Sequence, residues 1–441
     1  MKKAHCSLVA VAFLCASSLS AQQPVAAPAS GNPPSGMKLT LADAEATAIK
    51  NNPQITVARL QALVAQQQVR EVRSALLPNA DINLTGVESN PGSRVTAGAL
   101  NNPTVFPRAA YGAALSQLIT DFGRTGNLVS SSKLEAKAKD QDAVATRAQI
   151  LLAVDQAFYD TLEAQAMVHV AEETVRARQI LVDKVSALTQ AKLKSDLDLS
   201  FANVDLSRSK LLLLESKSKR ETAMAQLSAI LGYPDMQNFD LIEQAEPLSP
   251  PAPDVVPMIQ QALAQRPEVL ALQYQEQSAE KFSRAEHDLW LPTISALGVV
   301  GEAPVRDDNI PNWYGAAGVN IRIPIFNGFQ YNARAKAADL STEASRQRLA
   351  DLRNNVARDV RIIWQASNRA YERLAVTKQL RDQANLALEL AQSRYNLGLS
   401  SIVEFSQAEL QKTEADIADT DATYQYRQTE RAIRFVTGVL Q

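Results

Sequence analysis

The chain has 441 residues, with 45 Lys and Arg against 47 Asp and Glu, and it is 46% hydrophobic but only 5% aromatic. The near balance of charge argues against a nucleic-acid-binding protein, because such a protein carries an excess of basic residues. Glycine is limited to 16 residues while Ala, Leu, Gln, Glu, Lys and Arg are abundant, which favours long helices over compact mixed domains.

Residues 1–21 are predicted to form a secretory signal peptide, because two lysines precede an apolar run over 8–14 and small residues follow it. Cys6 and Cys15 both fall in this segment. We therefore expect the exported chain to have no disulfide and no cysteine metal site. A Pro- and Ala-rich N-terminal linker is expected over 22–38. No later apolar run reaches the roughly 18 to 20 residues of a membrane-spanning helix.

The rest of the chain is a tandem duplication. Pro53 and Pro78 recur as Pro267 and Pro292 with the same spacing between the two prolines. Such repetition indicates two copies of one structural unit. The predicted first repeat covers 39–243, a Pro-rich linker covers 244–254, and the second repeat covers 255–441.

Each copy shows the same order of elements. In the first copy we expect helices over 41–49 and 53–75, strands over about 81–87 and 111–119, a long helix ending near 188, and a last helix over 197–231. In the second copy the counterparts are helices over 256–264 and 267–289, strands over about 293–300 and 313–323, a long helix ending near 396, and a last helix over 402–436. The second and last helices of a copy together nearly match its long helix, which would span on the order of 100 Å. They can therefore lie end to end along it, antiparallel.

The four strands alternate between apolar and polar residues, most clearly over 313–323. Four strands cannot close a sheet, and an open edge in lipid leaves backbone groups unpaired. Three chains would supply enough strands for a closed barrel. Six aromatic residues at the strand ends are candidates for a membrane-interface girdle: Tyr111, Phe122, Trp290, Trp313, Tyr314 and Phe326. A small soluble sheet with the same aromatics in its core is the alternative.

The doubled pattern of helix, X-Pro, helix, Leu-Pro, strand pair and long helix resembles the TolC-like outer membrane efflux proteins, as does the segment 395–404, Tyr-Asn-Leu-Gly-Leu-Ser-Ser-Ile-Val-Glu. The resemblance covers nearly all of the mature chain. It implies a mostly α fold with a small β part, in which duplicated helical hairpins and four transmembrane β-strands per chain build a trimeric α/β-barrel channel. It also implies an outer-membrane location with the helices in the periplasm. The implied partners are a periplasmic adaptor and an inner-membrane pump.

The turns between the long and last helices would form the periplasmic tip of that channel. The resemblance assigns Asp198 and Glu404 to an acidic, cation-favouring entrance. Ser195 and Ser401 precede them with the spacing of a helix capping box, which gives both carboxylates a structural alternative. The candidates for the tip turns and for contact with the adaptor are Lys194, Ser195, Gly398, Leu399 and Ser401.

Two departures from the family pattern affect the expected closed state. In the closed state of the family, a Tyr, an Asp and an Arg are linked. In this sequence Tyr395 and Asp198 match the first two, and Ser400 stands at the position of the Arg. A second acidic entrance position holds Gln407. We therefore expect a less acidic entrance and a closed state that is held differently.

The predicted function is a passive exit duct of a tripartite efflux or type I secretion system, gated at the helical tip. We expect no enzyme activity, cofactor or metal site, because no catalytic constellation or nucleotide-binding motif is found and the histidines are isolated. The alternative is a soluble periplasmic coiled-coil scaffold or adaptor. Drugs, metals and secreted polypeptides all stay open as cargo.

Overall fold

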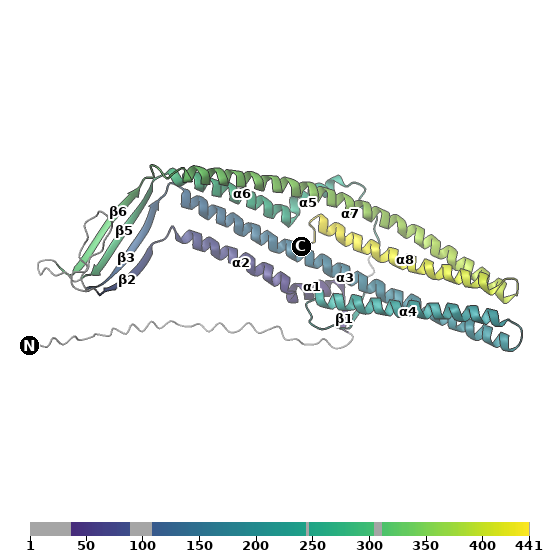
Figure 1. The fold of residues 1–441 in the computed structure, drawn as a ribbon. Helices are drawn as coiled ribbons and strands as arrows, with labels where there is room; N and C mark the ends of the chain where they lie inside the picture. Colours follow the sequence, from purple (N-terminus) through teal and green to yellow (C-terminus); the bar gives the residue numbers. More distant parts are fainter. Residues whose placement is uncertain (1–36, 89–107, 244–246, 304–310, 441) are drawn as a thin grey trace, which may run out of the picture.

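The computed structural model describes residues 37–88, 108–243, 247–303 and 311–440. The molecule is elongated, with a β-sheet at one end and, at the other, two turns that each connect a pair of helices (Figure 1). The predicted signal peptide, 1–21, lies outside the described residues. So do most of the predicted linker 22–38 and the start of the linker 244–254.

The two copies contain helices of matching length. The first copy has α1 (Leu41–Asn51), α2 (Pro53–Ser74), α3 (Arg124–Gln190) and α4 (Asp196–Ile230), and the second has α5 (Val256–Gln265), α6 (Pro267–His287), the short 3-10 turn η1 (Asp288–Trp290), α7 (Gln330–Asn396) and α8 (Ile402–Val436). Helices α3 and α7 have 67 residues each, and α4 and α8 have 35 each. The duplication read from the prolines is therefore a structural duplication.

The corner between α1 and α2 shows how one asparagine fixes two elements. Asn52 caps α2, because its side-chain oxygen accepts a hydrogen bond from the Gln54 backbone N–H at 2.9 Å, and Pro53 occupies the first helical position. The Asn52 side-chain amide donates to the backbone oxygen of Ile230 at the end of α4, also at 2.9 Å. The start of α2 is thereby tied to the end of α4.

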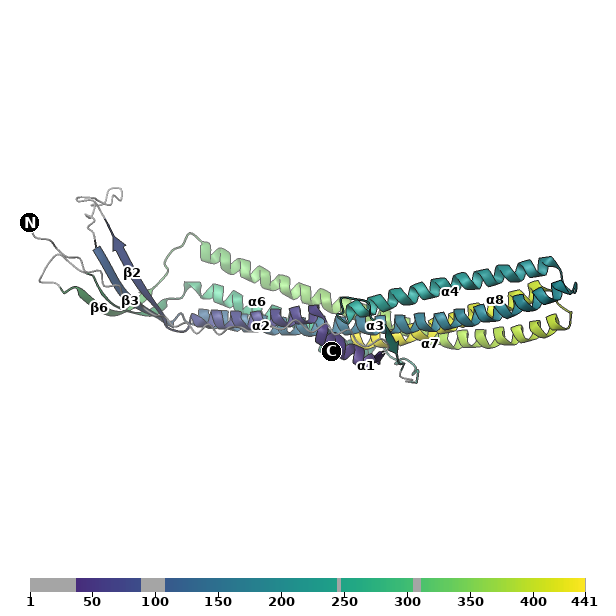
Figure 2. The ribbon, with the colours of Figure 1, turned by 90° about the horizontal axis from the view of Figure 1, so that it is seen from below.

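Helices α2 and α4 follow each other along α3, and α6 and α8 do so along α7, as the lengths predicted (Figures 1 and 2). The half near the sheet therefore contains α2, α3, α6 and α7. The half near the tip contains α3, α4, α7 and α8. Both long helices run through the junction between the halves, which we call the waist.

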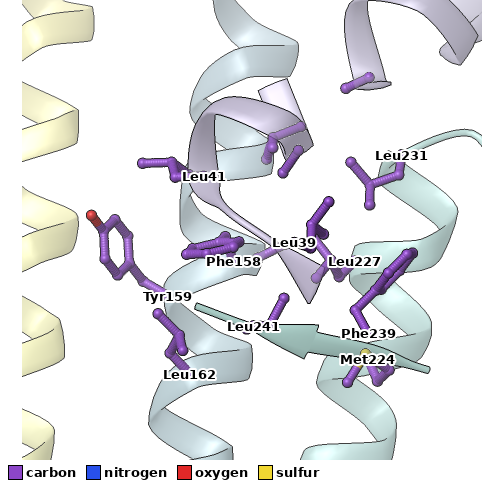
Figure 3. Packing of buried hydrophobic residues seen from close by; sticks show 14 of the residues in the cluster. Leu39, Leu41, Phe158, Tyr159, Leu162, Met224, Leu227, Leu231, Phe239 and Leu241 are labelled. Atoms are coloured by element: carbon purple, nitrogen blue, oxygen red, sulfur yellow. The ribbon is translucent and has the colours of Figure 1, made fainter. Parts of the chain in front are cut away.

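The waist carries the largest apolar cluster, in which side chains of α1, α3, α4 and two short strands pack together (Figure 3). Tyr424 of α8 also belongs to this cluster. The strands are β1 (Met37–Leu39) and β4 (Phe239–Leu241), which pair in parallel. They were not predicted, and residues 37 and 38 were expected to belong to the N-terminal linker. Leu39, Phe158 and Leu227 are at most 2% exposed in this cluster, so it anchors both ends of the first copy.

The sheet consists of β2 (Asn79–Val87), β3 (Arg108–Thr120), β5 (Thr293–Glu302) and β6 (Trp313–Arg322). Its order is β2-β3-β5-β6 with antiparallel neighbours. Three of the strands are longer than the predicted ranges by one to three residues at an end, and β6 ends one residue earlier. The edge strands β2 and β6 have no further partner strand in the described part of the chain.

The register divides the sheet into an apolar and a more polar face. Cross-strand partners on the apolar face include Ile82, Ala113, Val300 and Gly315, and the next such row runs from Leu84 through Tyr111 and Glu302 to Trp313. The opposite face carries Asn79, Asp81, Asn83, Ser116, Ser295 and Asn320. Ile82 and Leu84 are 75% and 80% exposed in the single chain, so no layer formed by the described residues covers the apolar face.

Candidate functional site

The candidate site is the pair of turns at the end opposite the sheet (Figure 1). Residues 191–195 connect α3 to α4, and residues 397–401 connect α7 to α8. Both reverse the chain with one left-handed residue, Lys192 (φ 60°) and Gly398 (φ 73°). In both turns the residue that follows the left-handed one closes the end of the long helix. The Leu193 N–H donates to the Leu188 carbonyl oxygen (2.8 Å), and the Leu399 N–H donates to the Arg394 carbonyl oxygen (2.9 Å). Lys192 adopts a backbone conformation that favours glycine.

The two serines cap the helices that leave the turns. Ser195 and Asp198 form a reciprocal capping box, in which the Asp198 N–H donates to Ser195 Oγ and the Ser195 N–H donates to Asp198 Oδ2, each at 3.2 Å. Ser401 Oγ accepts a hydrogen bond from the Glu404 N–H at 3.2 Å, without the return bond. The capping role predicted for the carboxylates therefore holds for Asp198 and not for Glu404.

Glu404 instead pairs with a neighbouring cation. Its Oε1 lies 3.4 Å from Nε of Arg394, which is in the last turn of α7. Both side chains are about half exposed, with 58% for the arginine and 49% for the glutamate. Screening by water makes such a pair weak, so Glu404 stays accessible to solvent ions.

Tyr395 is the most buried of the predicted gate residues, at 4% exposure. Its ring stacks on that of Phe405, with centroids 5.4 Å apart and planes 10° from parallel. Lys194 Nζ lies 4.5 Å from the centroid of the Tyr395 ring. The Tyr395 hydroxyl and Ser400 Oγ are buried, and neither has a hydrogen-bond partner among the described residues. Burial, followed by the charge of Asp198, raises the pKa of Tyr395.

An apolar cluster below the turns joins three helices of the tip: Leu181 and Val185 of α3, Ala391 and Tyr395 of α7, and Ile402, Phe405 and Ala408 of α8. One polar bond runs beside it, from Lys184 Nζ to Asn396 Oδ1 at 2.7 Å. The first hairpin (α3 and α4) and the second hairpin (α7 and α8) are therefore in direct contact at the tip.

A buried ionic group lies about three helical turns from the end of α3 and was not found from the sequence. Arg178 is 5% exposed, donates to Glu409 of α8, and has Asp205 of α4 at 3.9 Å. Arg178 and Asp205 line a cleft of about 410 Å³ between α4 and α8. Arginine is frequent on helix surfaces, and only the packing of three helices reveals that this one is buried.

The six girdle candidates occupy the two ends of the sheet. Phe122, Trp290 and Phe326 lie at the helical end. Tyr111, Trp313 and Tyr314 lie at the far end, where Tyr111 and Trp313 share the apolar face in register with Glu302. Tyr314 points to the opposite face, because a side chain on Gly112 or Gly301 would collide with its hydroxyl. The exposed fractions of the six range from 38% to 73%.

The described residues contain no group of three or more His, Cys, Asp or Glu side chains that could hold a metal ion. His169 and His287 each face a single carboxylate, Glu173 at 3.6 Å and Asp339 at 3.1 Å. Among the described helices, none is long and apolar enough to cross a membrane.

Comparison with known proteins identifies the fold and the family. The outer membrane efflux protein family matches residues 46–233 and 258–439, one match for each repeat. The outer membrane protein TolC of Vibrio cholerae is 25% identical over 423 residues, which cover 91% of each chain. The alkaline protease secretion protein AprF of Pseudomonas aeruginosa is 21% identical, covering 91% of this chain and 85% of its own.

Solved structures share the same architecture. The CmeC outer membrane channel of Campylobacter jejuni superposes with a TM-score of 0.77 at 18% identity, covering 90% of this chain and 85% of that one. The outer membrane protein VceC of Vibrio cholerae gives 0.76 at 16% identity, covering 90% and 96%. With the doubled hairpins and the open sheet, these matches show that the chain belongs to the outer membrane efflux protein family and has the TolC-like fold.

Proposed function

We propose that the protein is the exit duct of a tripartite efflux or type I secretion system, and that it works as a homotrimer. The observation that carries this proposal is the four-stranded sheet, which has two open edges and one exposed apolar face. Open edges in lipid leave backbone groups unpaired at several kcal/mol each. Three copies remove the edges by closing twelve strands into a barrel, an even number within the range of outer-membrane barrels.

The helices also present apolar stripes that are exposed among the described residues of the single chain. Helix α4 exposes Leu197, Phe201, Val204, Leu211 and Leu214 at helical spacing, and α2 exposes Val57, Leu60 and Val64. Helices of this length depend on packing of their apolar stripe. Neighbouring copies in a trimer would cover these stripes and enclose a water-filled duct that crosses the periplasm. Family membership in turn favours the channel over a soluble periplasmic scaffold.

The tip is the proposed gate and the proposed docking point for partners. Asp198 and Glu404 would ring the entrance, with Tyr395 and Ser400 beside them. The turns, with Lys194, Ser195, Gly398, Leu399 and Ser401, would meet a periplasmic adaptor that connects the duct to an inner-membrane pump. Leu193, Leu397 and Leu399 support this role, because each is about 70% exposed at the extreme end of the molecule. Opening would move the second hairpin away from the first.

Trimer formation is tested by extracting the protein from membranes. A duct requires detergent for extraction and runs as a trimer on gels until it is heated, whereas a scaffold is released by salt and runs as a monomer. The duct also conducts ions in a planar lipid bilayer. Release by salt, together with the absence of current, would refute the proposal.

The entrance role is tested by Asp198→Asn and Glu404→Gln. If the carboxylates ring the pore, the double variant loses cation preference and block by divalent cations. Asp183→Asn is a matched control, because Asp183 is exposed on α3 away from the turns. Unchanged selectivity in the double variant would remove both residues from the entrance.

A further inference from the structure

We propose that the closed tip is latched through the aromatic ring of Tyr395, which is held between Lys194 and Phe405, and that the Tyr395 hydroxyl is not the link. The proposal rests on the proposed function of the tip as a gate. It assigns Lys194 and Phe405 as positioning residues of that gate.

The three groups of the latch come from both hairpins. Lys194 lies in the turn between α3 and α4, whereas Tyr395 is in the last turn of α7 and Phe405 is in the first turn of α8. The two rings stack with centroids 5.4 Å apart, and Lys194 Nζ is 4.5 Å from the Tyr395 centroid. The first hairpin therefore supplies the cation and the second supplies the aromatic face. Separation of the hairpins must break this contact.

Burial fixes the rings and strengthens the contact. Tyr395 and Phe405 are 4% and 5% exposed, within the apolar cluster that joins α3, α7 and α8. Lys194 is half-buried and makes no salt bridge to a carboxylate among the described residues. An ammonium group over an aromatic face is held more strongly as it loses contact with water. The ring is thus the feature of the second hairpin that Lys194 contacts.

The polar groups around the ring are arranged differently from the closed state that the resemblance implies. The Tyr395 hydroxyl has no hydrogen-bond partner in the described part of the chain. Asp198 Oδ2 accepts the Ser195 N–H within the helix cap. At the position of the family arginine, Ser400 Oγ is likewise unpaired among the described residues. The ring, and not the hydroxyl, is therefore the part of Tyr395 that contacts Lys194 of the first hairpin.

The test separates the ring from the hydroxyl by single-channel recording of the full-length trimer in planar bilayers. Tyr395→Phe keeps the ring and removes the hydroxyl, so the fraction of time spent open stays at the wild-type value. Lys194→Gln removes the cation and raises that fraction by about fivefold or more, as expected for the loss of one such contact per chain. Lys194→Arg keeps a cation over the ring and restores closure.

Two further variants guard against indirect effects. Lys192→Gln removes the same charge from the same turn at an exposed position and leaves the open fraction unchanged. Phe405→Leu keeps an apolar side chain but removes the stack, and it opens the channel as Lys194→Gln does. Each variant must run as a trimer before heating.

The outcomes separate the two proposals. An open fraction at the wild-type value in Lys194→Gln, or an increased open fraction in Tyr395→Phe, overturns the proposed latch. Either result leaves the proposed function as an exit duct unaffected. Absence of current in every protein, including the wild type, overturns the duct and the latch with it.

Discussion

Asp155 allows a direct test of how the helices pack at the waist. It lies on α3 beside the largest apolar cluster and is 0% exposed. Neither of its carboxylate oxygens accepts a hydrogen bond from a donor in the described residues. Burial first, and then the charge of Glu45 on α1, raise the pKa of Asp155 from 3.8 to about 8, although Arg431 and Arg434 on α8 act in the opposite direction. A pKa of about 8 favours the protonated form of Asp155 at neutral pH.

The sign of the pH dependence follows from this shift. Between about pH 4 and pH 8 Asp155 binds a proton in the folded chain that it lacks in the unfolded chain, so its contribution to stability falls as the pH rises through this window and levels off above it. A shift of roughly four pKa units at about 1.4 kcal/mol per unit sets an upper bound on the order of 5 kcal/mol per chain. We expect this loss of stability mainly at the contact between α1 and α3.

Asp155→Asn removes the titrating group while keeping the shape of the side chain. We expect the difference in melting temperature between variant and wild type to grow as the pH rises from about 5 to 8, and the variant to be the more stable protein above that range. Circular dichroism of the full chain in detergent measures both curves. The matched control is Asp183→Asn at an exposed position of the same helix. A difference that stays constant with pH, or a variant that is less stable at pH 8, would refute the raised pKa of Asp155.

Three further predictions concern the backbone and the buried charges. Lys192→Gly should raise the free energy of unfolding by about 1 kcal/mol, because Lys192 has a φ of 60°; no gain in melting temperature would contradict the assigned turn. Arg178→Met should lower it by about 3 to 5 kcal/mol by leaving Glu409 buried and unpaired, and adding Glu409→Met should recover part of the loss in denaturant titrations. Gly301→Ala should lower the temperature at which the trimer dissociates on gels, because the new methyl group would lie 2.4 Å from a backbone oxygen of β3; Gly298→Ala, with open space around it, should not, and equal effects would refute the packing argument.

Most of the fold could be predicted from the sequence because its signals are local and occur twice. A proline marks the start of α2 and of α6, and alternating side chains mark the strands. Matched helix lengths then require α2 and α4 to follow each other along α3. Strands β1 and β4 were missed because three residues are too few to show a pattern, and their pairing joins segments about 200 residues apart.

The tip was predictable in position but not in its contacts. Spacing alone places Asp198 in a helix cap, because a cap is made within four residues of one chain segment. The pairing of Glu404 with Arg394 and the stack of Tyr395 on Phe405 depend on how α7 packs on α8, and the contact of Lys194 with Tyr395 depends on how the two hairpins pack. No local pattern specifies those meetings.

The sequence by itself determined the duplication, the lengths of the helices and the two-faced character of the strands, because these follow from backbone propensity and side-chain periodicity. Tertiary structure decided which polar groups are buried, among them Asp155, Arg178 and the Tyr395 hydroxyl. Burial depends on neighbours far away in the chain, and the free energy of a charge or a hydroxyl changes by several kcal/mol when those neighbours exclude water.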